Sequence, residues 1–274
     1  MLTNIICNKD TVININDKDE IELLLKVDND LKLVLNVKEN AHAIVQIRIT
    51  GKDHSLMITS NIEKYAKLTI IYWNEADNLR INEEVEIYDH ADYRIAYGEL
   101  ELKKIEREAH YHLLGYQARI DLVSVAIIKD HIKASLNAHH QGKESFSHIQ
   151  TYGVLLKDGE YDMVANGHIK KKATLSKSHQ VSRVLTLTDK QKAKVTPLLL
   201  IDENDVEASH AMSIGQLDEN QLYYLQSRGL SKNEALGLMS RGYLMAMTSI
   251  IDDEELKLKI QTQINKKVEN TCWM

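Results

Sequence analysis

Apolar and polar residues alternate in short runs from the start of the chain to about Ile201. Runs such as EIELLLKV, LKLVLNV and EEVEIY have the period of two that is typical of strands with one buried face. Turn-like segments such as VDNDL, TGKDH and EADN separate these runs at intervals of about 10–15 residues. The pattern therefore predicts many short strands in series.

Residues 96–116, AYGELELKKIEREAHYHLLGY, fit two interpretations. Their apolar residues include the i, i+3, i+4 spacing of an amphipathic helix. We nevertheless interpret the segment as a strand, because the runs on both sides of it have strand character.

A change of pattern after about Asp205 predicts helices, which are expected over 218–228, from 232 to near 248, and over 252–270. Ser231 and Glu234 form a capping-box sequence, and Gly229 is a typical residue just beyond a helix end. The last helix is acidic at its start and basic near its end, which suits the helix dipole. We therefore expect a β-rich body over 1–205 and a helical segment over 206–274.

Two architectures fit a series of short strands with few tight hairpin turns, no alternating helices and a single proline. One is an antiparallel sandwich or barrel, and the other is a β-helix in which each turn of the chain pairs with the next. A single Phe and two Trp suit a narrow interior filled with stacked aliphatic side chains. The pattern slightly favours the β-helix, although no exact repeat period is visible.

Composition and charge disfavour several classes of protein. The 274-residue chain has a net charge of −6, which disfavours a globally basic nucleic-acid binder. Its two cysteines, Cys7 and Cys272, form neither a disulfide framework nor a CxxC zinc site. The sequence has no recognisable signal peptide and no apolar run long enough to span a membrane. We expect a cytoplasmic protein that binds neither nucleic acid nor membrane.

Basic residues gather between Lys170 and Lys194, where eight Lys or Arg residues accompany a single acid, Asp189. Alternation along strands would place such side chains at outward-facing positions, where they are solvated. The same residues would also suit an electrostatic docking surface for an acidic partner or a nucleotide.

The sequence contains no GxGxxG, GxxxxGK[ST], GxSxG or HExxH motif, which argues against an enzyme. His110 and His112 would share one face of a strand, a spacing that can bind a metal ion, but no third and fourth ligand can be identified. The adjacent His139 and His140 would point to opposite faces, so they would not form a site together.

The most distinctive segment is Pro197–Leu230, PLLLIDENDVEASHAMSIGQLDENQLYYLQSRGL. It resembles the SufB/SufD core family of iron–sulfur cluster assembly proteins, over residues 135–274 by motif and over 1–135 by strand character. The residues that match the family pattern are Pro197, Asp205, Val206, Ser209, His210, Gly215, Leu217, Asp218, Glu219, Leu222, Tyr223, Tyr224, Leu225, Ser227, Arg228 and Gly229.

The resemblance implies a mainly β fold, a right-handed parallel β-helix followed by a C-terminal helical segment. Family members pair with a related subunit through their β-helices, and their C-terminal helices bind an ABC-type ATPase whose motion exposes a nascent-cluster site. The chain resembles a minimal core, because strand-like sequence begins near its start and the usual N-terminal helical extension is missing. The expected partners are therefore an ABC-type ATPase and a SufB-like subunit or a second copy of the chain.

Departures from the family pattern make the chain SufD-like. Leu225 and Ala208 stand where SufB-type and many SufD-type members carry cysteine, and Ala211 replaces a glycine. A [4Fe–4S] cluster needs about four thiolates or substitutes. We therefore expect no cofactor bound stably by this chain alone, and a transient iron–sulfur cluster only in a complex. His210 is the candidate metal ligand that carries over from the family.

The C-terminal helices are expected to have two roles. Their apolar faces would cover the open end of the β-helix, since exposed strand edges invite aggregation. Their outward residues would bind the ATPase; the candidates are Arg228, Gly229, Lys232, Asn233 and Arg241. Two alternatives stay open: a free-standing homodimeric β-helix module with a different binding role, and a β-helix enzyme acting on carbohydrate. The enzyme is disfavoured because no signal peptide is recognisable and only two Trp are available to stack on sugars.

Overall fold

The computed structural model describes residues 2–101, 103–187, 191–271 and 273. Its strands are β1 (Leu2–Cys7), β2 (Thr11–Ile15), β3 (Glu20–Val27), β4 (Leu31–Val37), β5 (His42–Gly51), β6 (Ser55–Ile62), β7 (Lys67–Asn74), β8 (Leu79–Ile87), β9 (Asp92–Glu99), β10 (Ile105–Leu113), β11 (Arg119–Ile128), β12 (His131–His140), β13 (Phe146–Leu155), β14 (Glu160–Ile169), β15 (Lys177–Thr186), β16 (Lys192–Ile201) and β17 (Glu207–Gln216). Its helices are α1 (Glu219–Ser227), α2 (Lys232–Leu244), the 3₁₀ helix η1 (Met245–Ile250) and α3 (Glu254–Asn270).

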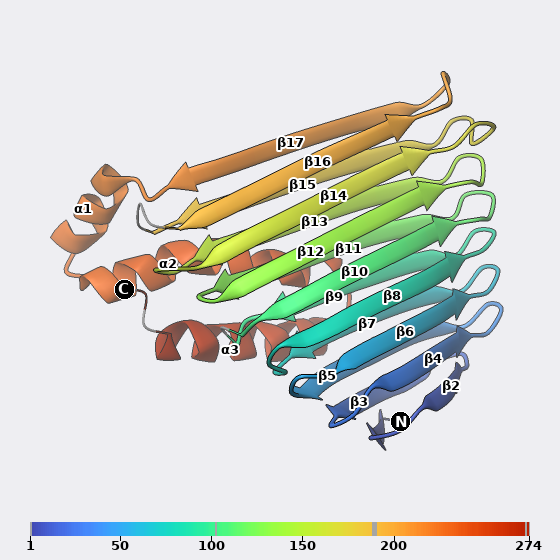
Figure 1. Cartoon of the computed structure of the whole chain (residues 1–274), viewed down its shortest axis with the longest axis horizontal. Coiled ribbons are helices and arrows are strands. Elements are labelled where there is room, and N and C mark those ends of the chain that lie inside the picture. The colour runs from blue at the N-terminus through green and yellow to red at the C-terminus, as the bar shows by residue number, and fades with distance from the viewer. Residues whose placement is uncertain (1, 102, 188–190, 272, 274) are drawn as a thin grey trace.

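The strands form a parallel β-helix. In the described part of the chain, the odd-numbered strands make one sheet of nine and the even-numbered strands make one of eight. Every recorded strand pairing is parallel, for example β10 with β12 and β11 with β13. In Figure 1 the nearer, even-numbered strands run left to right while the chain climbs, which is the right-handed sense. The expected β-helix is confirmed, residues 105–113 form a strand, and the sandwich alternative is wrong.

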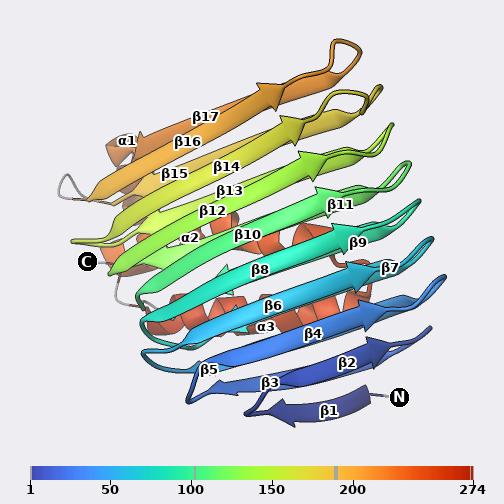
Figure 2. The same ribbon diagram turned by 45° about the vertical axis from the view of Figure 1, so that its right-hand side comes forward.

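The turns of this β-helix lengthen along the chain. Thr11 pairs with Leu33, 22 residues later, whereas Glu160 pairs with Lys192, 32 residues later. Strand β2 has 5 residues, and β16 and β17 have 10 each. Figure 2 shows the short strands at the bottom and the long ones at the top. Because the number of residues per turn increases along the chain, the sequence has no exact repeat period.

The interior differs from the expected stack of aliphatic side chains. The first turns are aliphatic, with Leu23, Leu33 and Leu35 almost wholly buried. The middle turns, however, hold large rings; the buried tyrosines are Tyr72, Tyr93, Tyr97, Tyr111 and Tyr161. The interpretation that a narrow interior excludes large rings is therefore wrong, because tyrosine fills it where phenylalanine and tryptophan do not.

The helices begin and end close to the expected residues. Asp218 accepts hydrogen bonds from the first turn of α1, and Ser231 with Glu234 makes the expected capping box of α2. Helix α2 ends at Leu244 and continues as η1, which is earlier than the expected end near 248. The helical segment starts at Glu219 and not at residue 206, because β17 extends the β-helix to Gln216.

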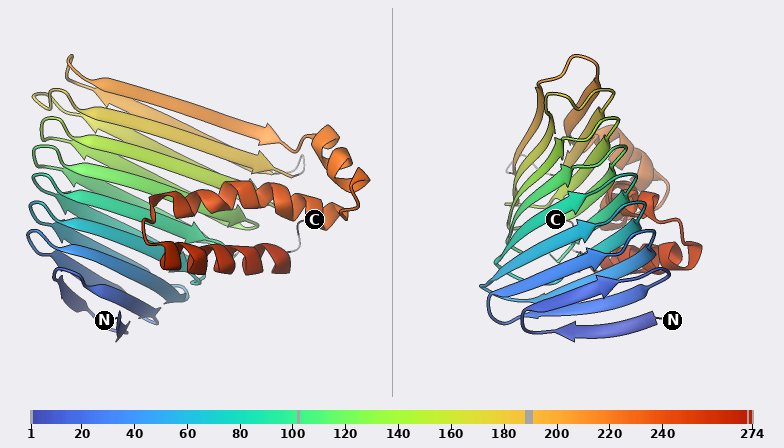
Figure 3. Two further views of the ribbon diagram at one scale, coloured as in Figure 1. Left: turned by 180° about the vertical axis from the view of Figure 1, so that it is seen from behind. Right: turned by 90° about the vertical axis from the view of Figure 1, so that its right-hand side faces the viewer.

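The helices lie on the side of the β-helix and not over its end. Figure 3 shows α2 and α3 across the sheet of odd-numbered strands. Outward-facing Val123, Val125 and Ile127 of β11 join apolar residues of α2, η1 and α3 in a second buried cluster. The expectation that these helices cover the open end is wrong, since the apolar outer face of β9, β11 and β13 holds them instead.

Candidate functional site: the open end of the solenoid

None of the residues that the structure describes covers the last turn of the β-helix. All residues of β17 are exposed. Met212 and Ile214 pair with Ser182 and Val184, which are buried in the interior, so they occupy inward-facing positions of the last turn. They nevertheless have exposed fractions of 47% and 44%. The wide end is thus an open mouth lined partly by apolar side chains.

The same turn also presents two free sheet edges. Strand β17 is the last strand of one sheet and β16 is the last of the other. Edge strands carry unpaired backbone N–H and C=O groups on one side, which makes them templates for further strand pairing. Leu198 and Leu200 of β16 are exposed beside this edge.

His210, the sequence-predicted metal ligand, lies in the middle of β17 opposite Gln180. Its side chain is exposed, and none of the residues that the structure describes hydrogen-bonds to it. Gln180 donates from Nε2 to the Leu198 carbonyl at 2.8 Å, while its buried Oε1 has no partner. His210 therefore stands at the mouth with its ring available to a ligand.

No thiol accompanies His210 among the described residues. Cys7 is buried in the first turn, at the other end of the β-helix, and Cys272 lies outside the described residues. Within that same part of the chain, no three His, Cys, Asp or Glu side chains are arranged to hold a metal ion. His210 could thus contribute one ligand to a site that other chains complete.

Helix α1 projects beyond the end of β17 (Figure 1). None of its residues is buried, and Tyr223 has an exposed fraction of 74%. Only Leu217 and Asp218 separate it from β17, and the Leu217 amide donates to the Thr186 carbonyl at 3.0 Å. A displacement of α1 would therefore act directly on the last strand.

The five predicted partner-binding residues fall into two groups. Arg228, Gly229 and Lys232 are exposed at the junction of α1 and α2, and the Arg228 guanidinium lies 5.1 Å from the Tyr224 ring centre. Asn233 is half-buried and accepts a hydrogen bond from the Trp273 amide at 3.1 Å. Arg241 is also half-buried, with its Nε buried and unpaired.

Three of the seven described basic residues in the stretch 170–194 form ion pairs with acidic side chains. Lys177 lies 2.6 Å from Glu207, Lys194 lies 3.6 Å from Asp162, and Lys192 forms an ion pair with Glu160. Lys190 is outside the described residues. The expected outward-facing strand positions hold for Lys177, Arg183, Lys192 and Lys194, whereas residues 170–172 follow β14 in a turn.

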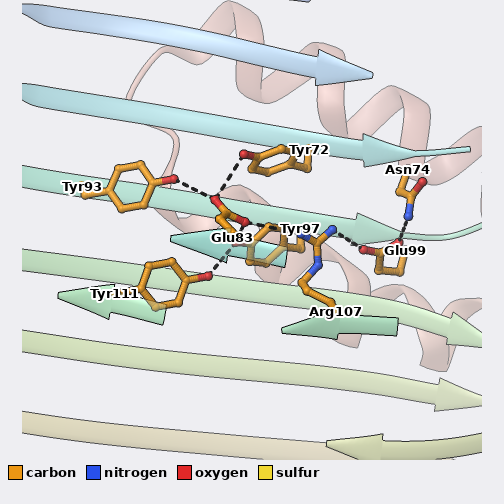
Figure 4. Close-up of polar contacts among 8 residues, drawn as sticks. All are labelled: Tyr72, Asn74, Glu83, Tyr93, Tyr97, Glu99, Arg107 and Tyr111. Atoms are coloured by element: carbon orange, nitrogen blue, oxygen red, sulfur yellow. Dashed lines mark hydrogen bonds and ion pairs between the residues drawn. The ribbon is translucent and has the colours of Figure 1, made fainter. Parts of the chain in front are cut away.

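A closed polar network fills the middle of the interior (Figure 4). The Glu83 carboxylate accepts hydrogen bonds from Tyr72 at 3.3 Å, Tyr93 at 3.4 Å and Tyr97 at 2.5 Å. Arg107 lies 3.5 Å from Glu83 and donates to Glu99 at 2.8 Å.

Burial and pairing set the charges of this network. Burial raises the pKa of Glu83, while Arg107 and the tyrosine hydroxyls oppose this shift. Burial disfavours the charged form of Arg107, but Glu99 and Glu83 outweigh it and raise its pKa. Sequence analysis did not predict this network, although Glu83 and Arg107 interrupt the otherwise mostly apolar inward positions of β8 and β10.

Hydroxyl-bearing residues replace the aliphatic ones toward the open end. The His140 ring lies 2.8 Å from both Ser145 Oγ and Ser147 Oγ, and Ser147 is 3.0 Å from Ser178. Burial lowers the pKa of His140 to about 3. The interior thus becomes more polar as it widens.

The predicted faces of the outer histidines are confirmed. His110 and His112 lie on the same outer face of β10, with ring centres 6.4 Å apart. His140 points inward, whereas His139 points outward and stacks on His112.

Comparison with known proteins finds a family model that matches most of this chain. A family model described as "SUF system FeS cluster assembly, SufBD core domain" matches residues 28–243, which reach further upstream than the motif found in the sequence. The iron–sulfur cluster assembly protein SufD of Bacillus subtilis is 38% identical over 130 residues, or 47% of this chain and 30% of that protein.

Other relatives have similar names. A SufBD family protein of Mycobacterium tuberculosis is 30% identical over 149 residues, covering 52% of this chain and 38% of the relative. Another, from Pyrococcus horikoshii, is 30% identical over 110 residues, covering 40% and 24%. The matched part is less than two fifths of each of these relatives.

No helix in the described residues has the length and apolar character needed to cross a membrane.

Proposed function

Because the chain belongs to the SufBD core domain family of the SUF iron–sulfur cluster assembly system, we propose that it is a SufD-like, non-enzymatic subunit of an iron–sulfur cluster assembly scaffold. It pairs with a SufB-like homologue or with a second copy of itself, and it binds an ABC-type ATPase in the cytoplasm. The uncovered last turn of the β-helix carries this proposal.

Pairing through the wide end is supported by the unpaired backbone groups and the exposed apolar side chains at that end. A second β-helix that placed its own edge strands against β16 and β17 would pair their free backbone groups. The same contact would remove Met212 and Ile214 from water. The nearly uniform exposure of β17 is otherwise unfavourable for a strand of 10 residues.

The iron–sulfur cluster is the cargo of this assembly. At the mouth this chain offers the imidazole of His210, with Ala208 and Ala211 beside it on the same strand. A [4Fe–4S] cluster needs about four ligands, mostly thiolates. The partner subunit therefore supplies the thiolates, and the cluster forms between the two chains.

ATPase binding is supported by the exposed helix α1 and the α1–α2 junction. Tyr223, Arg228 and Lys232 present an aromatic and cationic surface that the β-helix does not use. Because α1 follows β17 after only two residues, movement of a bound ATPase would be transmitted to the pairing edge.

Co-purification with the SufB-like homologue and the ABC-type ATPase of the same organism tests this function. We expect a ternary complex from the native chain. Replacing Met212 and Ile214 with Asp should abolish subunit pairing and leave ATPase binding intact, while Tyr223→Ala with Arg228→Ala should do the reverse. Leu258→Asp on α3 is the control, because Leu258 is also an exposed apolar residue and lies on another surface.

The outcomes separate the alternatives. Binding of neither protein by the folded chain would overturn the proposal. A homodimer that ignores the homologue would favour the free-standing module. Loss of cluster from the co-expressed complex on His210→Ala identifies His210 as a ligand, and an unchanged iron content removes it from the site.

A further inference from the structure

Three imidazoles lie together on the outer face of the even-numbered sheet, the face nearest the viewer in Figure 1. His110 and His112 are two residues apart on β10, and His139 pairs with His112 on the neighbouring strand β12. Their ring centres are 5.1 Å (His112–His139), 5.4 Å (His110–His139) and 6.4 Å (His110–His112) apart. The strand register therefore supplies the third histidine that the sequence could not identify.

Two ring nitrogens already lie near the separation that a shared metal ion requires. His110 Nδ1 is 3.1 Å from His139 Nε2. Two nitrogens bound at about 2.0–2.1 Å to one tetrahedral zinc ion lie roughly 3.3–3.4 Å apart. A small adjustment of the rings would therefore accommodate an ion between them.

Glutamate carboxylates contact the Nε2 atoms of two of the three rings. Glu84 Oε2 lies 2.9 Å from His112 Nε2, and Glu108 Oε1 lies 3.3 Å from His110 Nε2. A carboxylate that accepts a hydrogen bond from Nε2–H keeps the proton on Nε2 and leaves the lone pair on Nδ1, which is how metal-bound histidines are commonly oriented. Both rings are half-buried.

We propose that His110, His112 and His139 form a binding site for a divalent first-row transition-metal ion such as Zn²⁺, with water as the fourth ligand. In the described residues the rings are stacked and do not yet converge on one point. Rotation about the soft ring torsion turns the nitrogens toward the ion. The proton between His139 and His110 moves to the other nitrogen of His139, so all three imidazoles stay neutral.

Zinc binding by the full chain without an affinity tag tests this site. Isothermal titration calorimetry should find one ion per chain, and Co²⁺ should give the intense visible bands of a tetrahedral complex. His139→Asn should weaken Zn²⁺ binding at least tenfold and abolish those bands. Glu84→Gln should weaken it by about tenfold, as expected for loss of a carboxylate that orients a ligand.

His131→Asn is the matched control, because His131 lies on the same strand as His139 and also contacts a carboxylate, that of Glu160. It should leave zinc affinity unchanged. Circular dichroism establishes that each variant is folded, and His112→Asn replaces His139→Asn if the latter is not. The site is ruled out if the native chain binds no zinc at micromolar concentrations, or if the folded histidine variants bind it as tightly.

Discussion

The two ends of the β-helix differ in width and in burial. At the narrow end Ile13 and Ile15 belong to the first turn, yet their exposed fractions are 8% and 0%. At the wide end Ile214 occupies an equivalent inward position and is 44% exposed. Inward side chains of the long turns below the mouth, such as Tyr161 and Met163 of β14, are buried as well. Ile214 is exposed because no described strand or helix packs over the last turn, so the wide end is the one left open to a partner.

The interior between these ends changes in the same direction. It is aliphatic around Leu33 and Leu35, holds the network of Glu83 and Arg107 in the middle, and becomes rich in hydroxyl groups around His140. Buried polar groups are costly unless each is paired. The change in the free energy of unfolding that an inward substitution causes should therefore depend on its position along the β-helix axis.

The largest effect is expected in the middle turns. Arg107→Met leaves the buried carboxylates of Glu83 and Glu99 without their cation, and it should lower the free energy of unfolding by about 3–5 kcal/mol. Urea unfolding followed by circular dichroism measures this change. Arg183→Met, at an exposed position of β15, is the control and should change stability by less than about 0.5 kcal/mol. Equal effects of the two variants would show that the network is not stabilised by its cation.

A pair of truncations compares the two ends directly. Leu35→Ala removes a wholly buried side chain near the narrow end and should cost about 3 kcal/mol. Ile214→Ala at the mouth should cost less than about 0.5 kcal/mol in the monomer, because its side chain is already half in water. Thermal and urea unfolding at concentrations too low for pairing measure both. A large cost for Ile214→Ala would mean that the wide end is covered in the free chain.

An effect that is small per pH unit is expected in the upper interior. Burial lowers the pKa of His140 in the folded chain to about 3, while an unfolded histidine titrates near its ordinary value of about 6.5, so the unfolded chain takes up a proton that the folded chain does not. Stability should therefore fall as pH drops below 6.5, by up to about 1.4 kcal/mol per pH unit from this group. His140→Asn should make the pH dependence shallower by that amount. Exposed His42→Asn is the control, and an equal change in slope for both variants would contradict this assignment.

Alternation along the chain was sufficient to predict the strands, and capping residues were sufficient to predict the helices. Even residues 105–113 form the strand that their neighbours indicated. The position of the helices was not predicted, because the expectation relied on the general need of a β-helix to cover its end. The run LVSVAII, residues 122–128, carried the missing signal, since apolar residues at successive positions indicate a strand buried on both faces.

The candidate site was predicted unevenly. The family motif located His210 and α1, but their exposure depends on where the β-helix ends and on which surface the helices cover, and neither follows from local sequence. Glu83 and Arg107 were recognisable only once the inward positions of β8 and β10 were known. The contact of His139 with His110 depends on the register between β10 and β12, in which paired residues are 27 positions apart, as in Ile105 and Ile132. Local sequence patterns do not reveal this spacing of 27 residues between paired strands.

The lengthening of successive turns also restricts how copies of this fold can polymerise. A head-to-tail stack would place β2, with 5 residues, against β16, with 10, and would leave backbone groups of the longer strand unpaired. Wide end against wide end matches in length, and such a contact uses the same surface of both chains and consumes both edges. The taper thus disfavours a head-to-tail fibre, which a β-helix of constant width could build because its two ends would match in length.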